Sequence, residues 1–435
     1  MLSLNSAYMP PHPASKISIV GDRKDTDQRL RVLVLTAYRW PTTTRMAHAL
    51  SRTGAEVEAL CPSAHSLMRT NCVARTYRYN PLTPLRSLHR AITKSKPHLI
   101  VPTDDLIAAQ VHKLFHLAKG PDFPELRSLI ARSLGGGESY SRFYARSQIA
   151  LLAQKAGVFT PAVQEVANYG DLVNKLRIVG YPAVLKTDGS SGGAGVAIVH
   201  NELEAKRAFS RLSSSANVLL TLKRLIVDGD ANLILPCLRR TRLDVSIQPF
   251  VPGRLANIAV ACWEGSMLGQ VCVEVLSSNG ETGPATVVRV ISHAGMSQAA
   301  EKMVSQLKLS GLCGFDFILD SKNAAHLIDF NPRATQTCHL IPSDAQQPLA
   351  SLISKLGGSV SKEACKGPHD GPIVLFPHGF FHEKDGPFAK YAFNDLPADS
   401  PEFLTFGLEY RRKRSRPLVR AIRYLSTKLG GSSSK

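Results

Sequence analysis

The segment Lys186-Thr-Asp-Gly-Ser-Ser-Gly-Gly-Ala-Gly195 places one lysine directly ahead of a glycine-rich loop. The residues on either side, 182–186 and 195–199, are short apolar runs, which predicts two strands that the loop joins. Glycines let backbone N–H groups approach phosphate oxygens closely, and the lysine adds a mobile positive charge. The spacing of a strand-to-helix P-loop is absent. The segment therefore predicts a phosphate-covering flap, with a flexible surface hairpin as the alternative.

A second segment, Asp329-Phe-Asn-Pro-Arg333, carries acidic, amide and basic side chains in close succession. Apolar residues around it and around Asp316 predict an antiparallel pair of strands in which the two acids face each other. Asn331 shares the face of Asp329 because side chains alternate along a strand. Two carboxylates and an amide oxygen suit Mg²⁺, and Arg333 on the same face could contact a phosphoryl oxygen. An ordinary surface hairpin is the alternative.

The composition is that of a soluble globular protein with room for two or three domains. The chain has 435 residues, of which 44% are hydrophobic and 20% are charged. Strands predicted at 31–36, 56–60 and 97–102 alternate with helices predicted at 45–53 and 106–118. This alternation indicates an α/β fold with a parallel sheet in the first domain.

Further along, the pattern predicts a linker, two helices and a series of strands. The Pro- and Gly-bearing stretch 120–137 is expected to be linker, and 141–156 and 301–309 are expected to be helical. Strands are expected at 245–251, 255–262, 267–276, 286–291, 315–319 and 327–330. From Pro342 the sequence is weakly organised, apart from an apolar run at 373–376. The predicted divisions are a disordered lead-in at 1–28, domains at 29–125 and 140–345, an extension at 346–410 and a basic tail at 411–435.

The net charge of +19 favours anionic partners. Much of it lies between Arg411 and Lys428, where apolar residues at helical spacing alternate with basic ones and no acid occurs. This tail is either a solvated end or a basic amphipathic helix that contacts an anionic membrane surface weakly. Few aromatic residues lie among the basic ones, so specific nucleic-acid recognition is not expected. Cysteines without Cys-x-x-Cys spacing, and the lack of an apolar run of about 20 residues, favour reduced thiols and a cytoplasmic location.

Taken in order along the chain, these segments resemble the ATP-grasp superfamily. The resemblance covers roughly residues 30 to 345 and rests on four segments: Tyr181-Pro-Ala-Val-Leu-Lys186 with its loop, Ile247-Gln-Pro-Phe-Val-Pro-Gly253, Gly314-Phe-Asp316 and Ile328-Asp-Phe-Asn-Pro-Arg333. It implies a Rossmann-like pre-ATP-grasp domain followed by a two-lobed ATP-grasp domain, α+β in its ATP-binding part. It also implies ATP with Mg²⁺ or Mn²⁺ as cofactors.

The resemblance assigns roles to individual residues. It implies that Lys186 contacts the ATP phosphates, and that Arg146, where many members have a lysine, reaches them as well. Asp316, Asp329 and Asn331 are the implied metal ligands. Arg333 and Asn331 are the implied catalytic residues, with Arg333 beside the transferred phosphate. The other implied nucleotide contacts lie in the loop and in a segment that packs against adenine: Asp188, Ser190, Ser191, Gly192, Gly193, Gln248, Pro249, Phe250 and Val251.

The activity that the resemblance implies is ligation of a small carboxylate to an amine or other nucleophile through an acyl-phosphate, with release of ADP and phosphate. Arg289 and His339 lie near the motifs in sequence and are candidates for holding the carboxylate, with a surface arginine and a core histidine as alternatives. A phosphotransferase or a carbamate-phosphorylating enzyme would share every ATP residue. A non-catalytic nucleotide-binding or membrane-associated module also stays open, as do the substrates and the oligomeric state.

Overall fold

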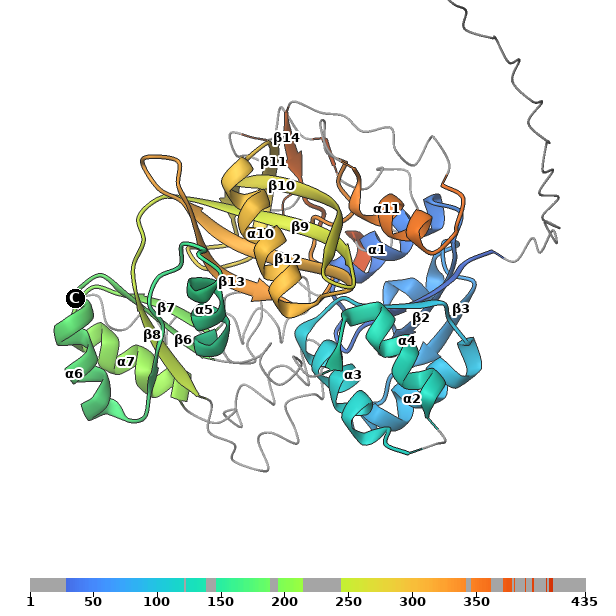
Figure 1. Cartoon of the computed structure of the whole chain (residues 1–435), viewed down its shortest axis with the longest axis horizontal. Coiled ribbons are helices and arrows are strands. Elements are labelled where there is room, and N and C mark those ends of the chain that lie inside the picture. The colour runs from blue at the N-terminus through green and yellow to red at the C-terminus, as the bar shows by residue number, and fades with distance from the viewer. Residues whose placement is uncertain are drawn as a thin grey trace, which may run out of the picture.

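The computed structural model describes residues 29–120, 123–137, 146–187, 195–213, 244–341, 346–360 and 371–377, with positions 379, 388, 393–394, 404 and 407–409. Three sheets organise these residues: a parallel N-terminal sheet, a large central sheet and a small antiparallel sheet (Figure 1). The predicted mixed α/β class is confirmed. The predicted lead-in at 1–28 and basic tail at 411–435 lie outside the described residues. No helix in the ranges given above is long and apolar enough to cross a bilayer.

The N-terminal sheet is parallel, as the alternation of strands and helices predicts. Its strands lie in the order β3 (Arg75–Arg78), β2 (Glu56–Cys61), β1 (Arg31–Leu35) and β4 (Leu99–Pro102). β1 and β4 are buried almost throughout because helices cover both faces of a parallel sheet. Those helices are α1 (Pro41–Arg52), α2 (Pro84–Ser95), α3 (Asp105–Leu117) and α4 (Pro124–Leu134), with a 3₁₀ turn η1 (Ser66–Arg69). The Rossmann-like description of this unit stays a prediction.

Helix α4 corrects the prediction of a linker at 120–137. Proline suggests a break within a helix, but at the first helical position its fixed φ is suitable and its missing N–H is not needed. Pro124 takes that position, and Leu129, Ile130 and Leu134 are buried in the same core as the sheet.

The central sheet contains seven strands within the described residues. Their order is β13 (Ala325–Asn331), β12 (Gly311–Leu319), β9 (Arg254–Trp263), β10 (Ser266–Ser278), β11 (Ala285–Ile291), β14 (Pro372–Val374) and β15 (Phe393–Asn394). Neighbours are antiparallel except for β14 and β15. Helix α10 (Ala294–Leu307) packs on one face, where Met303 lies in the cluster of Ile258. Helix α11 (Pro348–Lys355) packs on the other face, where Leu352 lies in the cluster of Val273.

Both of these helices differ from the sequence prediction. Helix α10 begins at Ala294 rather than at Glu301, because the side chain of His293 accepts a hydrogen bond from the N–H of Met296 and caps the helix. Helix α11 lies in a stretch predicted to be weakly organised. The side chain of Gln347 caps this helix, and Pro348 is its first residue. The apolar pattern that follows is too short to have indicated a helix.

The small sheet carries the predicted pair of strands around the glycine-rich loop. Its antiparallel order is β5 (Gln164–Val166), β8 (Val245–Pro249), β6 (Ala183–Thr187) and β7 (Val196–Val199). Helices α6 (Tyr169–Val179) and α7 (Glu202–Ser213) pack on it around a core of their own. Helix α5 (Arg146–Lys155) instead contacts β13 and α10 of the central unit. The small and central sheets thus lie beside each other, with α5 between their elements (Figure 1).

The N-terminal unit meets the central sheet where α4 ends and β12 begins. Gly135, which follows α4, forms a bridge with Leu309. Gly311, the first residue of β12, has a φ of +80°, and a Cβ there would lie 1.9 Å from the carbonyl oxygen of Ser133. Only glycine fits this approach of two backbones. The predicted domain boundaries are not tested by these contacts and stay predictions.

We expect Gly311→Ala to destabilise the protein by about 3–5 kcal/mol, since the left-handed φ and the overlap with Ser133 both oppose a methyl group. Gly357→Ala is the matched control, because Gly357 has a φ of +82° with no atom within 4 Å of the added Cβ, and it should cost only about 1–2 kcal/mol. Denaturant unfolding of both variants measures the difference. Equal losses would show that the contact of α4 with β12 is not tight.

Candidate functional site

Two carboxylates face each other on the central sheet, as the alternation along the strands predicts. Asp316 of β12 pairs in register with Asp329 of β13, and Asn331 lies two residues further along the same face. Nδ2 of Asn331 donates a hydrogen bond to Oδ2 of Asp316 at 3.0 Å. On the opposite face, the rings of Phe315 and Phe330 stack with centroids 5.0 Å apart. This buried stack fixes the hairpin that presents the three polar side chains.

The acid pair changes the ionisation of Asp316. Burial and then the negative charge of Asp329 raise the pKa of Asp316 to about 6, against the opposing effects of the Asn331 hydrogen bond, Arg333 and Lys186. A cation that binds beside such a carboxyl stabilises its ionised form. The residues therefore fit a hard divalent cation, with two carboxylates and an amide on one face.

No group of three or more His, Cys, Asp or Glu side chains that could hold a metal occurs in the described part of the chain. A cation at Asp316 and Asp329 would consequently need other ligands. Mg²⁺ commonly binds through one or two carboxylates and completes its shell with water and phosphate oxygens, so this donor set suits a metal that arrives with a phosphate.

Lys186 crosses from the small sheet to the acid pair. It lies on β6, is 5% exposed, and its Nζ donates to the carbonyl oxygen of Ile328 at 2.7 Å. Ile328 is skipped in the register of β12 with β13, which marks a β-bulge at this residue. The bulge therefore offers the lysine an oxygen immediately beside Asp329. Residues 142 positions apart in sequence meet here.

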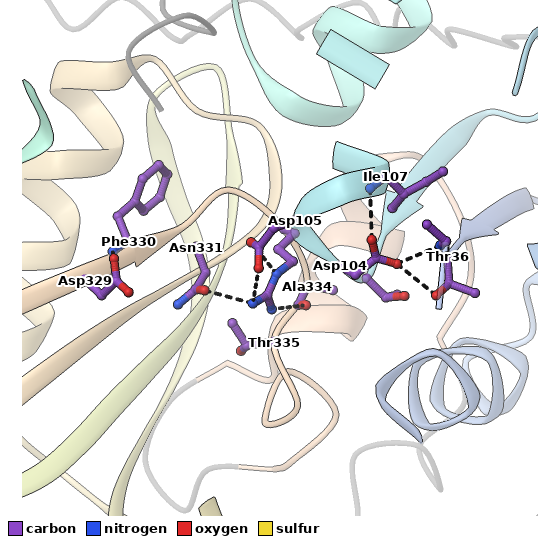
Figure 2. Close-up of polar contacts among 12 residues, drawn as sticks. Thr36, Asp104, Asp105, Ile107, Asp329, Phe330, Asn331, Ala334 and Thr335 are labelled. Atoms are coloured by element: carbon purple, nitrogen blue, oxygen red, sulfur yellow. Dashed lines mark hydrogen bonds and ion pairs between the residues drawn. The ribbon is translucent and has the colours of Figure 1, made fainter. Parts of the chain in front are cut away.

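Arg333 follows two residues after Asn331, and different residues hold it. Its Nε donates to Oδ1 of Asp105 at 2.7 Å and its Nη2 to Oδ2 of the same carboxylate at 3.0 Å. Nη2 also donates to Oδ1 of Asn331 at 2.9 Å. Burial opposes its charge, but the carboxylates of Asp105, Asp104 and Asp316 outweigh burial and raise the pKa of Arg333. Figure 2 draws the contacts that reach Asp105 and Asn331 as dashed lines.

A small, mostly apolar recess adjoins Asp329 between the small sheet, α5 and β13. Gln248 enters it from β8 and is buried. The other lining residues are Ile149, Ala150, Thr160, Val163, Leu327, Ile328, Asp329 and Phe330. Pro249 ends β8, and the N–H of Phe250 donates to the carbonyl of Pro182 at 3.3 Å. Of the predicted segment 248–251, the recess is lined by Gln248 alone.

Several predicted site residues lie outside what the structure describes. Asp188, Ser190, Ser191, Gly192 and Gly193 all fall in the loop 188–194. Arg146 begins α5, but its side chain is likewise outside the described part. The roles predicted for these residues stay predictions.

The structure does not bring Arg289 to the acid pair. The register across the sheet aligns Arg289 of β11 with Phe317 of β12, by way of Glu274 and Ala256. Phe317 is next to Asp316 in the strand, so Arg289 lies on the opposite face of the sheet from Asp316. The guanidinium of Arg289 forms an ion pair with Glu274 at 2.6 Å. His339, the second candidate for holding a carboxylate, is half-buried in the segment after β13.

Sequence reasoning missed two polar contributions to this face. Asp105 follows β4 of the N-terminal sheet and contacts Arg333, and Asn257 of β9 pairs in register with Asp316. Oδ1 of Asn257 accepts a hydrogen bond from Thr337 at 3.0 Å. The acids directly after the predicted strand 97–102 were a signal that Asp105 lies at the edge of the sheet, but not that it contacts Arg333. Nothing local marks Asn257, since only the strand register identifies its neighbour.

We expect Asp316→Asn to stabilise the metal-free protein above pH 6. The folded state holds the Asp316 proton more tightly than the unfolded chain does, so wild-type stability falls as pH rises between about 4 and 6. The variant lacks this loss. Its free energy of unfolding should exceed that of the wild type by about 1–2 kcal/mol at pH 7.5, after allowance for partial exposure, and should equal it at pH 4. Denaturant unfolding in EDTA measures the gap.

Asp320→Asn is the control on the adjoining turn. A hydrogen bond from His326 lowers the pKa of Asp320, so this substitution should give no gain at high pH. A gap between wild type and Asp316→Asn that does not change with pH would contradict the assignment.

Comparison with curated proteins gives distant relatives, and no family model matches the chain. The large chain of carbamoyl phosphate synthase from Vibrio parahaemolyticus is 22% identical over 276 residues, which cover 62% of this chain and 23% of the relative. The same protein from Agathobacter rectalis is 25% identical over 332 residues, covering 72% of this chain and 28% of the relative. The chain thus spans about a quarter of the length of these curated relatives.

Solved structures match most of the chain at low identity. The biotin carboxylase domain of 2-oxoglutarate carboxylase from Hydrogenobacter thermophilus, a complex with MgADP and bicarbonate, has a TM-score of 0.54 and 15% identity and covers 79% of this chain and 73% of its own. N5-carboxyaminoimidazole synthetase from Staphylococcus aureus, complexed with ADP, has a TM-score of 0.54 and 14% identity over 82% and 87%. An L-amino acid ligase from Bacillus licheniformis has a TM-score of 0.53 and 14% identity over 79% of each chain. The chain therefore has the fold of the ATP-grasp superfamily, which its motifs predict.

Proposed function

We propose that the chain is an ATP- and Mg²⁺-dependent ligase that joins a carboxylate to an amine or another nucleophile through an acyl-phosphate. The observation that carries this proposal is the reach of Lys186 from the small sheet to the backbone beside Asp329. One cation and two acids from separate motifs meet there, next to a recess. This is the charge pattern required to hold a phosphate chain together with its metal.

Lys186 would bind phosphate oxygens in place of its present contact with Ile328. A buried ammonium group beside two carboxylates needs an acceptor, and the Ile328 carbonyl supplies one when no phosphate is bound. Several neighbours with the same fold carry ADP in their solved structures, which supports a nucleotide at this position. The glycine-rich loop 188–194 would cover the phosphates.

Mg²⁺ would be held by Asp316, Asp329 and Asn331. When bound, it would neutralise the negative charge on the transferring phosphoryl group. The two carboxylates lie on one face of a rigid hairpin, and Oδ1 of Asn331 lies beside them, where Arg333 donates to it. Arg333 adds positive charge next to them, and its contacts with Asp105 and Asn331 fix the plane of its guanidinium. No side-chain nucleophile is required, because positioning and neutralisation suffice for phosphoryl transfer.

The recess beside Gln248 would take the adenine ring. Its lining is mostly apolar, which suits a flat aromatic base, and the buried Gln248 amide offers both a donor and an acceptor. Arg146 is the proposed second phosphate contact from α5, and Pro249, Phe250 and Val251 complete the proposed adenine-binding segment.

The choice of a carboxylate as the first substrate rests on neighbours of the fold. One is complexed with bicarbonate and another is an L-amino acid ligase. A phosphotransferase acting on a hydroxyl would share every residue named above, so it is the second candidate. The product separates the two reactions.

The experiment is incubation of the protein with ATP, Mg²⁺ and pooled small carboxylates and amines, with nucleotides and new masses followed by mass spectrometry. We expect ADP, phosphate and a condensed product in equal amounts, and a loss of at least 100-fold in Asp329→Asn, which removes one proposed metal ligand. Asp320→Asn, on the turn of the same hairpin, is the control and should keep wild-type turnover. ADP with a phosphorylated product would favour the phosphotransferase, and no ATP binding would overturn the proposal.

We expect Lys186→Met to weaken binding of Mg·ADP by about 10- to 100-fold, because a charge-assisted phosphate contact is worth about 1.5–3 kcal/mol. Lys302→Met is the matched control: its Nζ also donates to a backbone carbonyl, that of Gly157 at 3.2 Å, but on the exposed surface. Calorimetric titration measures both. Equal affinities for the two variants would exclude Lys186 from the phosphate site.

A further inference from the structure

A continuous chain of hydrogen bonds runs from the first turn of α3 to the acid pair. Asp105 accepts two bonds from Arg333, at 2.7 and 3.0 Å, in the parallel arrangement typical of an arginine and a carboxylate. The two side chains are only 19% and 12% exposed, so solvent screens this pair little. The N-terminal unit thereby supplies a charge to the site on the central sheet.

Arg333 determines how the Asn331 amide is oriented. A guanidinium has only donors, so the atom of Asn331 that faces Arg333 must be the acceptor Oδ1. The donor Nδ2 is then turned toward Oδ2 of Asp316, where it bonds at 3.0 Å. A reversed amide would place Nδ2 against the guanidinium and Oδ1 against the carboxylate, which is unfavourable at both ends.

Hydrogen bonds of the neighbouring residues fix the backbone at Asp105. The neighbouring Asp104 is fully buried and caps α3, accepting from the N–H of Ile107 at 2.9 Å and from the N–H of Ala37 at 2.8 Å. Figure 2 shows Asp104 turned toward Thr36 while Asp105 points toward the site. The N–H of Ala334 also donates to the carbonyl of Pro102 at 3.0 Å, so the segment after β13 is tied to the end of β4.

We propose that Asp105 is a positioning residue of the metal site: through Arg333 it fixes the Asn331 amide, whose Nδ2 then orients the carboxylate of Asp316. This rests on the proposed function, because it assumes that Asp316, Asp329 and Asn331 hold the cation. Asp105 also neutralises Arg333, which would otherwise place an uncompensated positive charge next to a divalent ion. Partners of metal ligands typically change metal affinity by about 10- to 100-fold when removed.

The test uses Mn²⁺ as the probe, with its affinity measured by electron paramagnetic resonance in the presence of ADP. We expect Asp105→Asn, which keeps the shape but loses the charge, to bind Mn²⁺ about 10- to 100-fold more weakly. Asp105→Glu, which keeps a carboxylate, should recover part of the loss. Glu125→Gln is the matched control, since Glu125 is an exposed acid in the first turn of the neighbouring helix α4.

A double-mutant cycle separates positioning from general damage to the fold. If Asp105 acts through Arg333, Asp105→Asn should weaken Mn²⁺ binding little further in a protein that already carries Arg333→Gln. Additive losses would overturn the proposal, as would wild-type Mn²⁺ affinity in Asp105→Asn while Asp329→Asn loses binding. Absence of Mn²⁺ and ADP binding in the wild type would instead overturn the proposed function, and this inference with it.

Discussion

The register of β12 against β13 sets the carboxylates of Asp316 and Asp329 opposite each other, and the other polar groups of the site surround this pair. Directly opposed side chains on such strands lie about 5 Å apart, and like charges at that distance repel by on the order of 3 kcal/mol at an effective dielectric constant of about 20. Asn331 donates a hydrogen bond to Asp316, and the positive charges of Lys186 and Arg333 favour the ionised form of Asp316. The pKa of Asp316 is nevertheless raised. The remaining negative charge is what a divalent cation would neutralise.

Each of the three units contributes charged side chains to this point. The small sheet provides Lys186, the central sheet provides the acids, and the N-terminal unit provides Asp105. The site therefore exists only when the three units are docked, and close contacts such as that of Gly311 with Ser133 fix part of that docking. Ligand binding at such a junction would in turn stabilise the arrangement of the units.

The sequence predicts the features that depend on local periodicity. The two-residue alternation in β12 and β13 placed Asp316, Asp329 and Asn331 on one face, and the strands around the glycine-rich loop are confirmed as β6 and β7. Helices α4 and α11 were missed, because the prolines that open them, Pro124 and Pro348, also suit a linker. The contact of Asp105 with Arg333, across 228 residues, has no local signal because only the packing of separate units creates it.

The central claim is that a nucleotide and a divalent cation bind between the small sheet and the β12–β13 hairpin. A crystal structure of the protein grown with ADP and Mn²⁺ tests this most directly, because anomalous scattering locates the metal. The account predicts a Mn²⁺ peak within bonding distance of Asp316 and Asp329, with Lys186 turned from the Ile328 carbonyl to the nucleotide phosphates. Metal and nucleotide bound elsewhere, or an empty site at saturating ligand, would contradict it.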